Sequence, residues 1–455
     1  MQHGDQGLGG DGAHRSSSPA RAAAASFAGA VMDWYDFFVY GLVAALTFPK
    51  LFFPANDPAT GTLLTFATFG VGFVARPLGG IVFGHYGDKI GRKAMLVLTL
   101  VLMGLGTAAI SVLPGYAEIG VAAPVLLVAL RFVQGFAVGG EWGGAALMAV
   151  EHAPEARRGF FGSFVQVGAS VGLLIATAVV AVVNAATTNA QFLAWGWRIP
   201  FLVSLAVVLG GYLIRRGVAE SPEFVHEVKE GHREARTPLN EALRQSPGAF
   251  LKIVGMRLAE LVSFYTVTVF ALNYGAAHGI ARASLLNATL AIGVVAIVLI
   301  PAMGALSDRV GRKPVFVAGA LIGVVGAFPL FWAIESGSLL WITLAFVLVA
   351  NLCHDPVVAV QQPLFTEMFD PAFRYSGAGF AYQLASAVAG GFTPLIAASL
   401  ALKAGGGYTY VALYLAGACL ISAVTGLLYA GPQPYRAPEY FGTAVPPGTG
   451  APHRV

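Results

Sequence analysis

The chain reads GHYGDKIGRK at residues 84–93 and GALSDRVGRK at residues 304–313. Five residues of the first stretch recur 220 positions later (304 − 84 = 220): Gly84, Asp88, Gly91, Arg92 and Lys93 match Gly304, Asp308, Gly311, Arg312 and Lys313. Each copy is a short charged segment between long apolar runs. A polar loop that is repeated at this distance in such a chain predicts two homologous halves.

A second repeat supports the same division. Four residues at the start of one apolar run recur 217 positions later at the start of another: Pro154, Arg157, Gly162 and Gln166 match Pro371, Arg374, Gly379 and Gln383. Two related halves with a solute path between them are typical of secondary transporters. The repeats therefore predict a transporter-like membrane fold.

The composition agrees with a membrane protein. Hydrophobic residues make up 56% of the chain and charged residues 11%, with a mean hydropathy of +0.71, whereas soluble domains have about 25% charged residues. A membrane-spanning helix needs about 20 apolar residues. We therefore predict an all-α membrane protein with twelve transmembrane helices in two pseudo-symmetric six-helix halves, at about 22–48, 61–83, 94–113, 121–149, 159–183, 196–214, 249–274, 284–306, 314–333, 339–368, 375–401 and 408–430.

These runs predict five parts: a tail over 1–21, an N-terminal half over 22–214, a charged linker over 215–248, a C-terminal half over 249–430, and a tail over 431–455. If the N-terminus is cytoplasmic, most lysines and arginines fall in cytoplasmic segments, which is the positive-inside pattern. We expect both termini in the cytoplasm and the lipid bilayer as the environment. The net charge of +4 then reflects topology, and no nucleic-acid partner is expected.

The loop pattern G-x3-D-x2-GRK resembles the signature of the major facilitator superfamily. The stretches DWYDFFVYG (33–41), RFVQGFAVGGEWGGA (131–145), WGWRIPF (195–201) and AESPEF (219–224) are similar to its metabolite:proton symporter family. HDPVVAVQQPLFTEMF (354–369) resembles the shikimate-transporting branch of that family. The resemblance extends from about residue 22 to 428.

The resemblance implies the major facilitator fold, a place in the bacterial cytoplasmic (inner) membrane, and proton-coupled import of shikimate or a closely similar small carboxylate by alternating access. The alternative is a symporter for another organic acid or for a zwitterionic osmolyte such as betaine or proline. We expect a functional monomer with no cofactor besides the coupling proton. No HExxH or paired metal-ligand motif appears within the apolar runs, so we expect no enzyme activity.

Charges within membrane spans are costly and are therefore candidates for function. Shikimate has one carboxylate, and the planar fork of arginine suits a carboxylate. We favour Arg257 for this role, with Arg131 as the alternative; Arg257 and Glu260 could instead neutralise each other. Arg76 is interpreted as a structural or gating charge. Neutral polar and aromatic candidates for the substrate site are Gln134, Tyr40, Asn273, His354, Gln361, Tyr382 and Gln383.

The coupling proton requires a carboxylate that changes its charge. Asp36 and Glu141 are the first candidates because both lie near the middle of a span. Asp33, Glu260 and Asp355 are further candidates. Asp36 could instead stay ionised beside an arginine, and Glu141 could only join two helices by a hydrogen bond.

The repeated loops predict a gate. Asp88 should lie at the start of the helix near Arg374, where the positive end of the helix dipole stabilises an anion by about 0.3–2 kcal/mol. By the same repeat, Asp308 should lie near Arg157 or Arg158. With Arg92 and Arg312, these contacts would hold the cytoplasmic side closed; alternatively the motif only sets topology and a tight turn.

Overall fold

The computed structural model describes residues 18–54, 58–216, 220, 238–429 and 431. All regular elements within this part of the chain are helices. Nine of them are long and apolar enough to cross a membrane, and a tenth candidate, Asn189–Gly196 with Arg198–Ile214, is bent by 47°. The helices α1 and α2, 33 residues each, bring the set to the predicted twelve. Helices dominate because lipid offers the backbone no hydrogen-bond partners.

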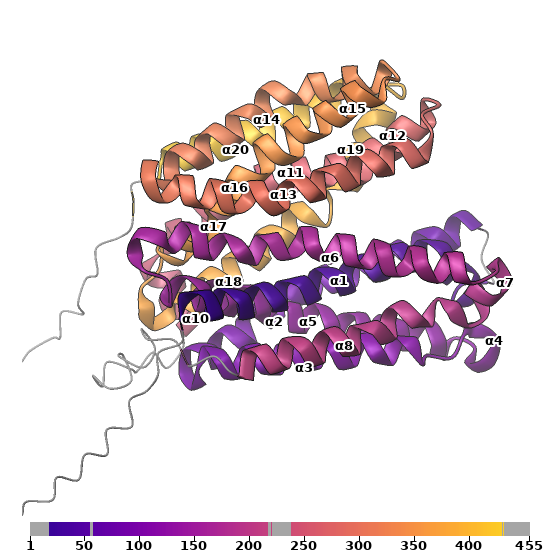
Figure 1. The fold of residues 1–455 in the computed structure, drawn as a ribbon, viewed down its shortest axis with the longest axis horizontal. Coiled ribbons are helices and arrows are strands. Elements are labelled where there is room, and N and C mark those ends of the chain that lie inside the picture. The colour runs from indigo at the N-terminus through magenta and orange to yellow at the C-terminus, as the bar shows by residue number, and fades with distance from the viewer. Residues whose placement is uncertain (1–17, 55–57, 217–219, 221–237, 430, 432–455) are drawn as a thin grey trace, which may run out of the picture.

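The N-terminal half forms the first six spans (Figure 1). Its elements are α1 (Pro19–Leu51), α2 (Pro58–Ile90), α3 (Arg92–Ser111), α4 (Tyr116–Ile119), α5 (Ala122–Glu151), the 3₁₀ turn η1 (Glu155–Arg157), α6 (Arg158–Ala186), and a sixth span built from α7 (Asn189–Gln191), the π-helical η2 (Phe192–Gly196) and α8 (Arg198–Arg216). Glycines bring α2 and α5 into close contact: a Cβ at Gly139 would lie 2.1 Å from the Arg76 carbonyl oxygen. Small residues of this kind allow helices to approach closely in lipid.

The C-terminal half follows the short helix α10 (Pro238–Gln245), and most of it forms the upper part of the molecule in Figure 1. Its elements are α11 (Pro247–Tyr265), η3 (Thr266–Phe270), α12 (Ala271–Ala277), α13 (Arg282–Val310), α14 (Arg312–Glu335), α15 (Leu339–Phe346), η4 (Val347–His354), α16 (Asp355–Ala359), α17 (Gln361–Thr366), η5 (Pro371–Phe373), α18 (Arg374–Ala385), η6 (Ser386–Gly390), α19 (Thr393–Lys403) and α20 (Thr409–Leu427). The segments η3, η4 and η6 are π-helical, a feature frequent at functional sites.

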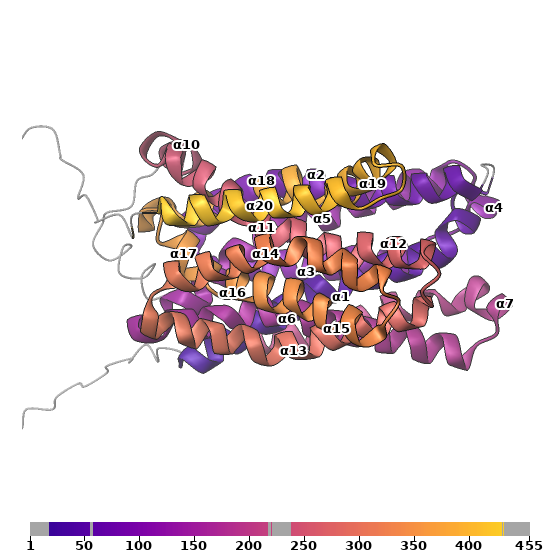
Figure 2. The ribbon, with the colours of Figure 1, turned by 90° about the horizontal axis from the view of Figure 1, so that it is seen from above.

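The two halves meet along α6 with α13 and along α2 with α18. The helices α17 of span 10 and α18 of span 11 also pack on α5. Figures 1 and 2 show α10, α17 and α18 at the same end of the bundle. We call this end, where both copies of the repeated loop lie, the motif end. The halves are therefore joined at the motif end.

Candidate functional site

The central cavity lies between the two halves. It has a volume of about 80 Å³ and is lined from the N-terminal half by α1, α2, α5 and α6, and from the C-terminal half by α11, η4, α16, α18 and η6. A smaller cavity of about 30 Å³ lies within the N-terminal half, between α1, α2, α3 and α5. Asp33, Phe37, Phe73, Arg76 and Val138 line both cavities. The two cavities therefore adjoin at one wall formed by α1, α2 and α5.

Arg257 is buried on the C-terminal wall of the central cavity. Its Nε and Nη2 donate to the two carboxylate oxygens of Glu260 at 2.8 and 2.7 Å. Its Nη1 donates to the Tyr382 carbonyl and to the Ser386 hydroxyl, both at 2.5 Å. The guanidinium also lies 3.3 Å over the Tyr382 ring. Four of its five N–H groups are therefore engaged, and the fork is occupied by Glu260.

Arg76 reaches the same cavity from α2 in the other half. Its guanidinium lies over the ring of Phe73, 4.2 Å from the centroid, and 5.8 Å from the Phe37 centroid. Its Nε is buried without a hydrogen-bond partner, and among the described residues no carboxylate lies within ion-pair distance of it. Asp33 interacts with it electrostatically from farther away. Arg76 is thus a partly buried cation whose fork is not occupied, in contrast to Arg257.

The remaining walls combine flat aromatic faces with neutral polar groups. Tyr382 stacks on Trp142 with ring centroids 3.7 Å apart, and His354 stacks on Phe264. The amides of Gln166 and Gln383 also line the cavity; Gln383 donates to the Val138 carbonyl at 3.3 Å. Such walls can bind a ring on its faces and hydroxyls at its edge.

A chain of hydrogen bonds lies in the N-terminal half beside the smaller cavity. The Arg131 guanidinium lies 3.5 Å over the Tyr40 ring and donates to Gln134 at 2.9 Å. Gln134 donates to Thr107 at 2.6 Å, and the Thr107 hydroxyl lies 2.6 Å from an Asp36 oxygen. Arg131 and Asp36 are therefore linked through two neutral residues, and neither lines the central cavity.

Three other predicted residues lie behind the cavity walls. Glu141 is buried and accepts a 2.7 Å hydrogen bond from Thr99 of α3, away from both cavities. Asp355 lies behind His354, 3.1 Å from its Nδ1, and accepts from Asn351 at 2.7 Å. Gln361 is buried and donates to Glu260 at 2.8 Å. Gln361 therefore supports the Arg257–Glu260 pair instead of lining the cavity.

Two further predicted substrate residues, like Arg131, Gln134 and Gln361, lie outside the central cavity. Asn273 is exposed on α12 and donates to the Val269 carbonyl of its own span, because its position on the helix faces away from the cavity. Tyr40 is buried under Arg131, where its hydroxyl lies 2.5 Å from that of Thr68. Neither lines the central cavity.

The sequence interpretation missed several cavity residues. Arg76 is interpreted from the sequence as a structural or gating charge, whereas in the structure it lines the central cavity. Trp142, Gln166, Phe264 and Ser386 also line this cavity. A signal for Gln166 was present, because the 217-residue repeat pairs it with Gln383, which lines the cavity from the other half.

At the motif end, the first copy of the loop binds α18. Asp88 accepts hydrogen bonds from the backbone N–H groups of Tyr375 and Ser376, at 3.2 and 2.9 Å, and from the Ser376 hydroxyl at 2.6 Å. Gly84 faces Ser376 so closely that a Cβ would lie 2.8 Å from its Cα. Gly91 has φ = 131°, which favours glycine at the turn into α3. The predicted contact of Asp88 with the first turn of this helix is therefore present.

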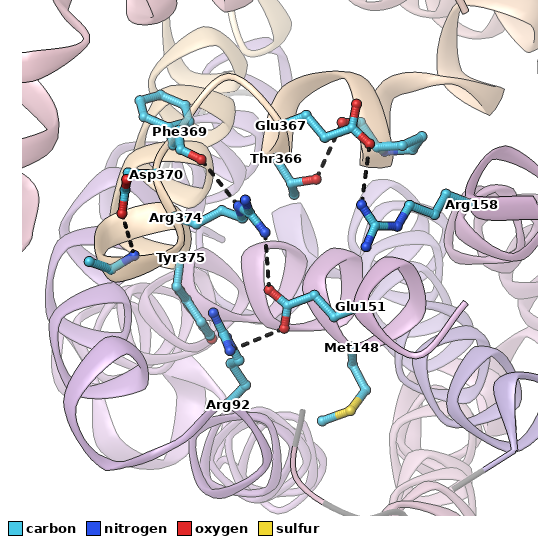
Figure 3. A network of polar contacts seen from close by, with 12 residues as sticks. Arg92, Met148, Glu151, Arg158, Thr366, Glu367, Phe369, Asp370, Arg374 and Tyr375 are labelled. Carbon is cyan, nitrogen blue, oxygen red and sulfur yellow. Dashed lines mark hydrogen bonds and ion pairs between the residues drawn. The ribbon is translucent and has the colours of Figure 1, made fainter. Parts of the chain in front are cut away.

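The arginine of the first copy belongs to a buried ion-pair network (Figure 3). Arg92 lies 3.1 Å from Glu151, whose other oxygen lies 3.6 Å from Arg374 of the opposite half. Glu220 of the linker accepts from the backbone N–H of Arg92 at 3.1 Å. Burial lowers the pKa of nearby His152, so this imidazole is neutral at pH 7. We call the contacts of Asp88 and Arg92 the first latch.

The second copy mirrors these contacts, and we call them the second latch. Asp308 accepts from the backbone N–H groups of Gly159 and Phe160 at 2.8 and 2.9 Å. Glu367 pairs with Arg312. It also lies 3.8 Å from Arg158 (Figure 3). A Cβ at Gly304 would lie 2.6 Å from the Gly159 carbonyl oxygen.

The second latch uses Arg158, one of the two arginines predicted near Asp308. Arg158 begins α6 as Arg374 begins α18, so the two helix starts are 216 positions apart (374 − 158 = 216). Arg157, which the 217-residue repeat pairs with Arg374, is exposed in the preceding turn η1. The ion pair to Glu367 therefore uses Arg158.

Comparisons with known proteins agree with this architecture. Residues 22–264 match the family model of sugar (and other) transporters, and residues 256–447 match that of the major facilitator superfamily. The chain is 53% identical to the shikimate transporter of Escherichia coli (strain K12), over 92% of this chain and 96% of that protein. The chain belongs to the major facilitator superfamily.

Other relatives and solved structures show the breadth of that superfamily. The proline/betaine transporter of Salmonella typhimurium is 34% identical over 90% of this chain and 82% of its own length. The proton:xylose symporter XylE, bound to 6-bromo-6-deoxy-D-glucose, superposes with a TM-score of 0.73 at 17% identity, covering 91% of this chain and 96% of that one. FucP in the outward conformation gives a TM-score of 0.65 at 15% identity, over 90% and 99% of the two chains. This superfamily member is a multi-pass membrane transporter of small molecules and not an enzyme.

Proposed function

We propose that the protein imports shikimate, or a closely similar small ring carboxylate, together with protons across the bacterial inner membrane. The observation that carries this proposal is the unoccupied guanidinium of Arg76 in a cavity between two transporter halves. A cation that is partly removed from water and has no carboxylate partner is stabilised by an anionic ligand. The 53% identity to a shikimate transporter supports the choice of anion.

In this proposal the substrate carboxylate binds the fork of Arg76. The sequence favoured Arg257, but Glu260 occupies the fork of Arg257. The substrate ring then lies among the aromatic side chains of the central cavity, and its hydroxyls bond the amides of Gln166 and Gln383. The coupling proton is the only ion required, and one chain without nucleic acid or cofactor suffices.

The two latches support a direction of transport from the outside to the cytoplasm. We place the motif end in the cytoplasm, with both termini, because most lysines and arginines then lie inside. Both latches are closed in the structure, so the site would be sealed from the cytoplasm and available to the outside. Import then requires the latches to open while the opposite end closes.

Binding of labelled shikimate to the purified protein tests the proposal. Arg76→Gln should abolish binding, and Arg76→Lys should weaken it because a point charge replaces the fork. Arg198→Gln is the matched control, since Arg198 lies over Trp197 outside the cavity and should leave binding unchanged. Wild-type affinity in a folded Arg76→Gln variant would contradict the proposal.

A zwitterionic substrate is the second candidate. It is favoured by the pairing of Arg76 and Asp33 with aromatic rings in one cavity, because aromatic faces bind quaternary ammonium groups. Quinate, citrate, betaine and proline should each be tested as competitors. Displacement of shikimate by betaine at a lower concentration than by quinate would favour this candidate.

A further inference from the structure

The charges that line the central cavity cancel. Arg76 and Arg257 supply two positive charges, and Asp33 and Glu260 supply two negative charges. A monovalent anion that enters alone would leave one uncompensated negative charge in a cavity that is closed at the motif end. Burying an unpaired charge is costly. The anion should therefore enter together with one positive charge, and a proton on one of the two carboxylates would supply it.

Glu260 occupies the position that a substrate carboxylate would take on Arg257. Both of its oxygens accept from the guanidinium, at 2.8 and 2.7 Å, which is the bidentate geometry that arginine forms with any carboxylate. Meanwhile the Tyr382 carbonyl and the Ser386 hydroxyl hold Nη1 in place. If Glu260 loses its charge, Arg257 remains oriented at the cavity wall with its fork released.

We propose that Glu260 takes the coupling proton, and that its protonation releases Arg257 for the substrate's carboxylate. This inference rests on the proposed function. Arg76 of the N-terminal half and Arg257 of the C-terminal half then hold the anion together, so that substrate and proton are both needed to join the halves around the site. The proton passes from external water to a Glu260 oxygen. When the substrate leaves to the cytoplasm, the proton leaves too, and Glu260 pairs with Arg257 again.

Several polar groups face Glu260. Gln361 donates to one of its oxygens at 2.8 Å, His354 interacts with it electrostatically, and Tyr265 and Tyr382 lie close by. From the N-terminal half, Arg76 and Asp33 face the same cavity. Behind His354, Asp355 contacts its Nδ1. The imidazole therefore lies between two buried carboxylates, where it can pass a proton.

The other candidate carboxylates are less directly connected with the substrate. Asp36 lies at the smaller cavity and is held by Thr107. Glu141 faces α3 and accepts from Thr99. Asp33 also lines the central cavity, but the fork of Arg257 is occupied by Glu260.

The test compares wild type with Glu260→Gln in proteoliposomes and in detergent. Wild type should bind shikimate about tenfold more weakly for each unit that the pH rises above the pKa of Glu260, as expected for one linked proton. The variant, whose Arg257 has no anionic competitor, should bind with an affinity that does not change with pH. It should still exchange labelled for unlabelled shikimate, but should not accumulate shikimate under a pH gradient. Glu335→Gln, a carboxylate-to-amide change at an exposed site on α14, should behave as wild type.

Two further measurements keep the inference falsifiable if Glu260→Gln folds poorly. Shikimate added to unbuffered wild type should cause uptake of one proton per bound molecule. Infrared difference spectra should show a protonated carboxyl that appears on binding, and this band should be reduced in Glu260→Asp, which keeps a carboxyl but shortens its reach. If wild type accumulates shikimate with protons and Glu260→Gln does so equally well, the inference fails while the proposed function stands. If wild type does not bind shikimate or is not driven by protons, the proposed function itself fails.

Discussion

The two latches make the same contacts with different burial. In the first latch, the side chains of Arg92 and Glu151 are 1% and 0% exposed, and Asp88 accepts from a hydroxyl as well as from two backbone N–H groups. In the second, Arg312 and Glu367 are 21% and 11% exposed, and Asp308 accepts from two backbone N–H groups. Phe160 takes the place that Ser376 has in the first latch, so the corresponding hydroxyl is missing.

This difference indicates that the two related loops contribute unequally to the stability of the closed state. An ion pair that is removed from water is strongly destabilised when one partner is lost, whereas a pair in contact with water contributes little. We therefore expect the α2–α18 contact to hold the closed state and the α6–α13 contact to yield first. Each prediction below compares matching positions in the two latches.

The largest difference in stability should come from the carboxylate that pairs with two arginines in each latch, Glu151 in the first and Glu367 in the second. Glu151→Gln removes the charge that Arg92 and Arg374 share, so we expect a loss of about 3–5 kcal/mol in the stability of the closed state. Glu367→Gln should cost about 0–1 kcal/mol, because its pairs are partly exposed. Melting temperatures of the two purified variants measure this. Equal shifts would show that burial does not distinguish the latches.

The aspartates should show a smaller difference in the same direction. Asp88→Asn keeps the shape but removes the charge from the start of α18, which is worth about 0.3–2 kcal/mol. It should favour the state open at the motif end and slow the return step of transport. Asp308→Asn should do so less, since Asp308 is only partly buried. The rate at which a cysteine introduced at the motif end reacts with a membrane-impermeant thiol reagent reports the conformational bias; a stronger effect of Asp308→Asn would reverse the assignment.

Removing one hydroxyl should make the first latch resemble the second. Ser376→Ala deletes the 2.6 Å hydrogen bond to Asp88 but keeps both backbone donors. The expected cost is about 1 kcal/mol, and the thiol reactivity should move toward that of Asp308→Asn. Ser336→Ala, at an exposed helix end, is the matched control. A Ser376→Ala variant with unchanged reactivity would show that the hydroxyl does not separate the latches.

The lysines of the two loops should give the smallest difference in stability. Here the second latch, and not the first, should show the larger effect. Lys93 donates to the Arg216 carbonyl at the end of α8, at 3.1 Å. Lys313 donates to two carbonyls at the C-terminal end of α20, that of its last residue Leu427 at 2.5 Å and that of Tyr429 at 3.1 Å. A cation at a helix C-terminus contributes about 0.3–1 kcal/mol. Lys313→Ala should therefore lower the melting temperature slightly more than Lys93→Ala, and a clearly larger effect of Lys93→Ala would contradict this.

Much of the architecture could be predicted from the sequence. Twelve apolar runs, two copies of one charged loop and a second repeat at the helix starts were enough for the twelve-helix fold and for the pairing of Asp88 with the helix that begins at Arg374. The fold could be predicted because lipid forces the backbone into helices. The pairing could be predicted because two symmetry-related halves make each contact twice. The alignment of Gln134 and Glu141 on one face of α5 also follows from helical spacing, since both bond threonines of α3.

The tertiary structure alone decided which charges meet. Both faces of a membrane helix are apolar, so hydropathy does not reveal how each helix is rotated about its axis. For that reason the sequence could place neither Asn273 outside the cavity nor Arg76 at its wall. The Arg257–Glu260 pair was visible as a three-residue spacing, but its occupied fork was not. Whether an arginine is neutralised or available depends on side chains that neighbouring helices bring within about 3 Å, and only the packing of the helices sets that distance.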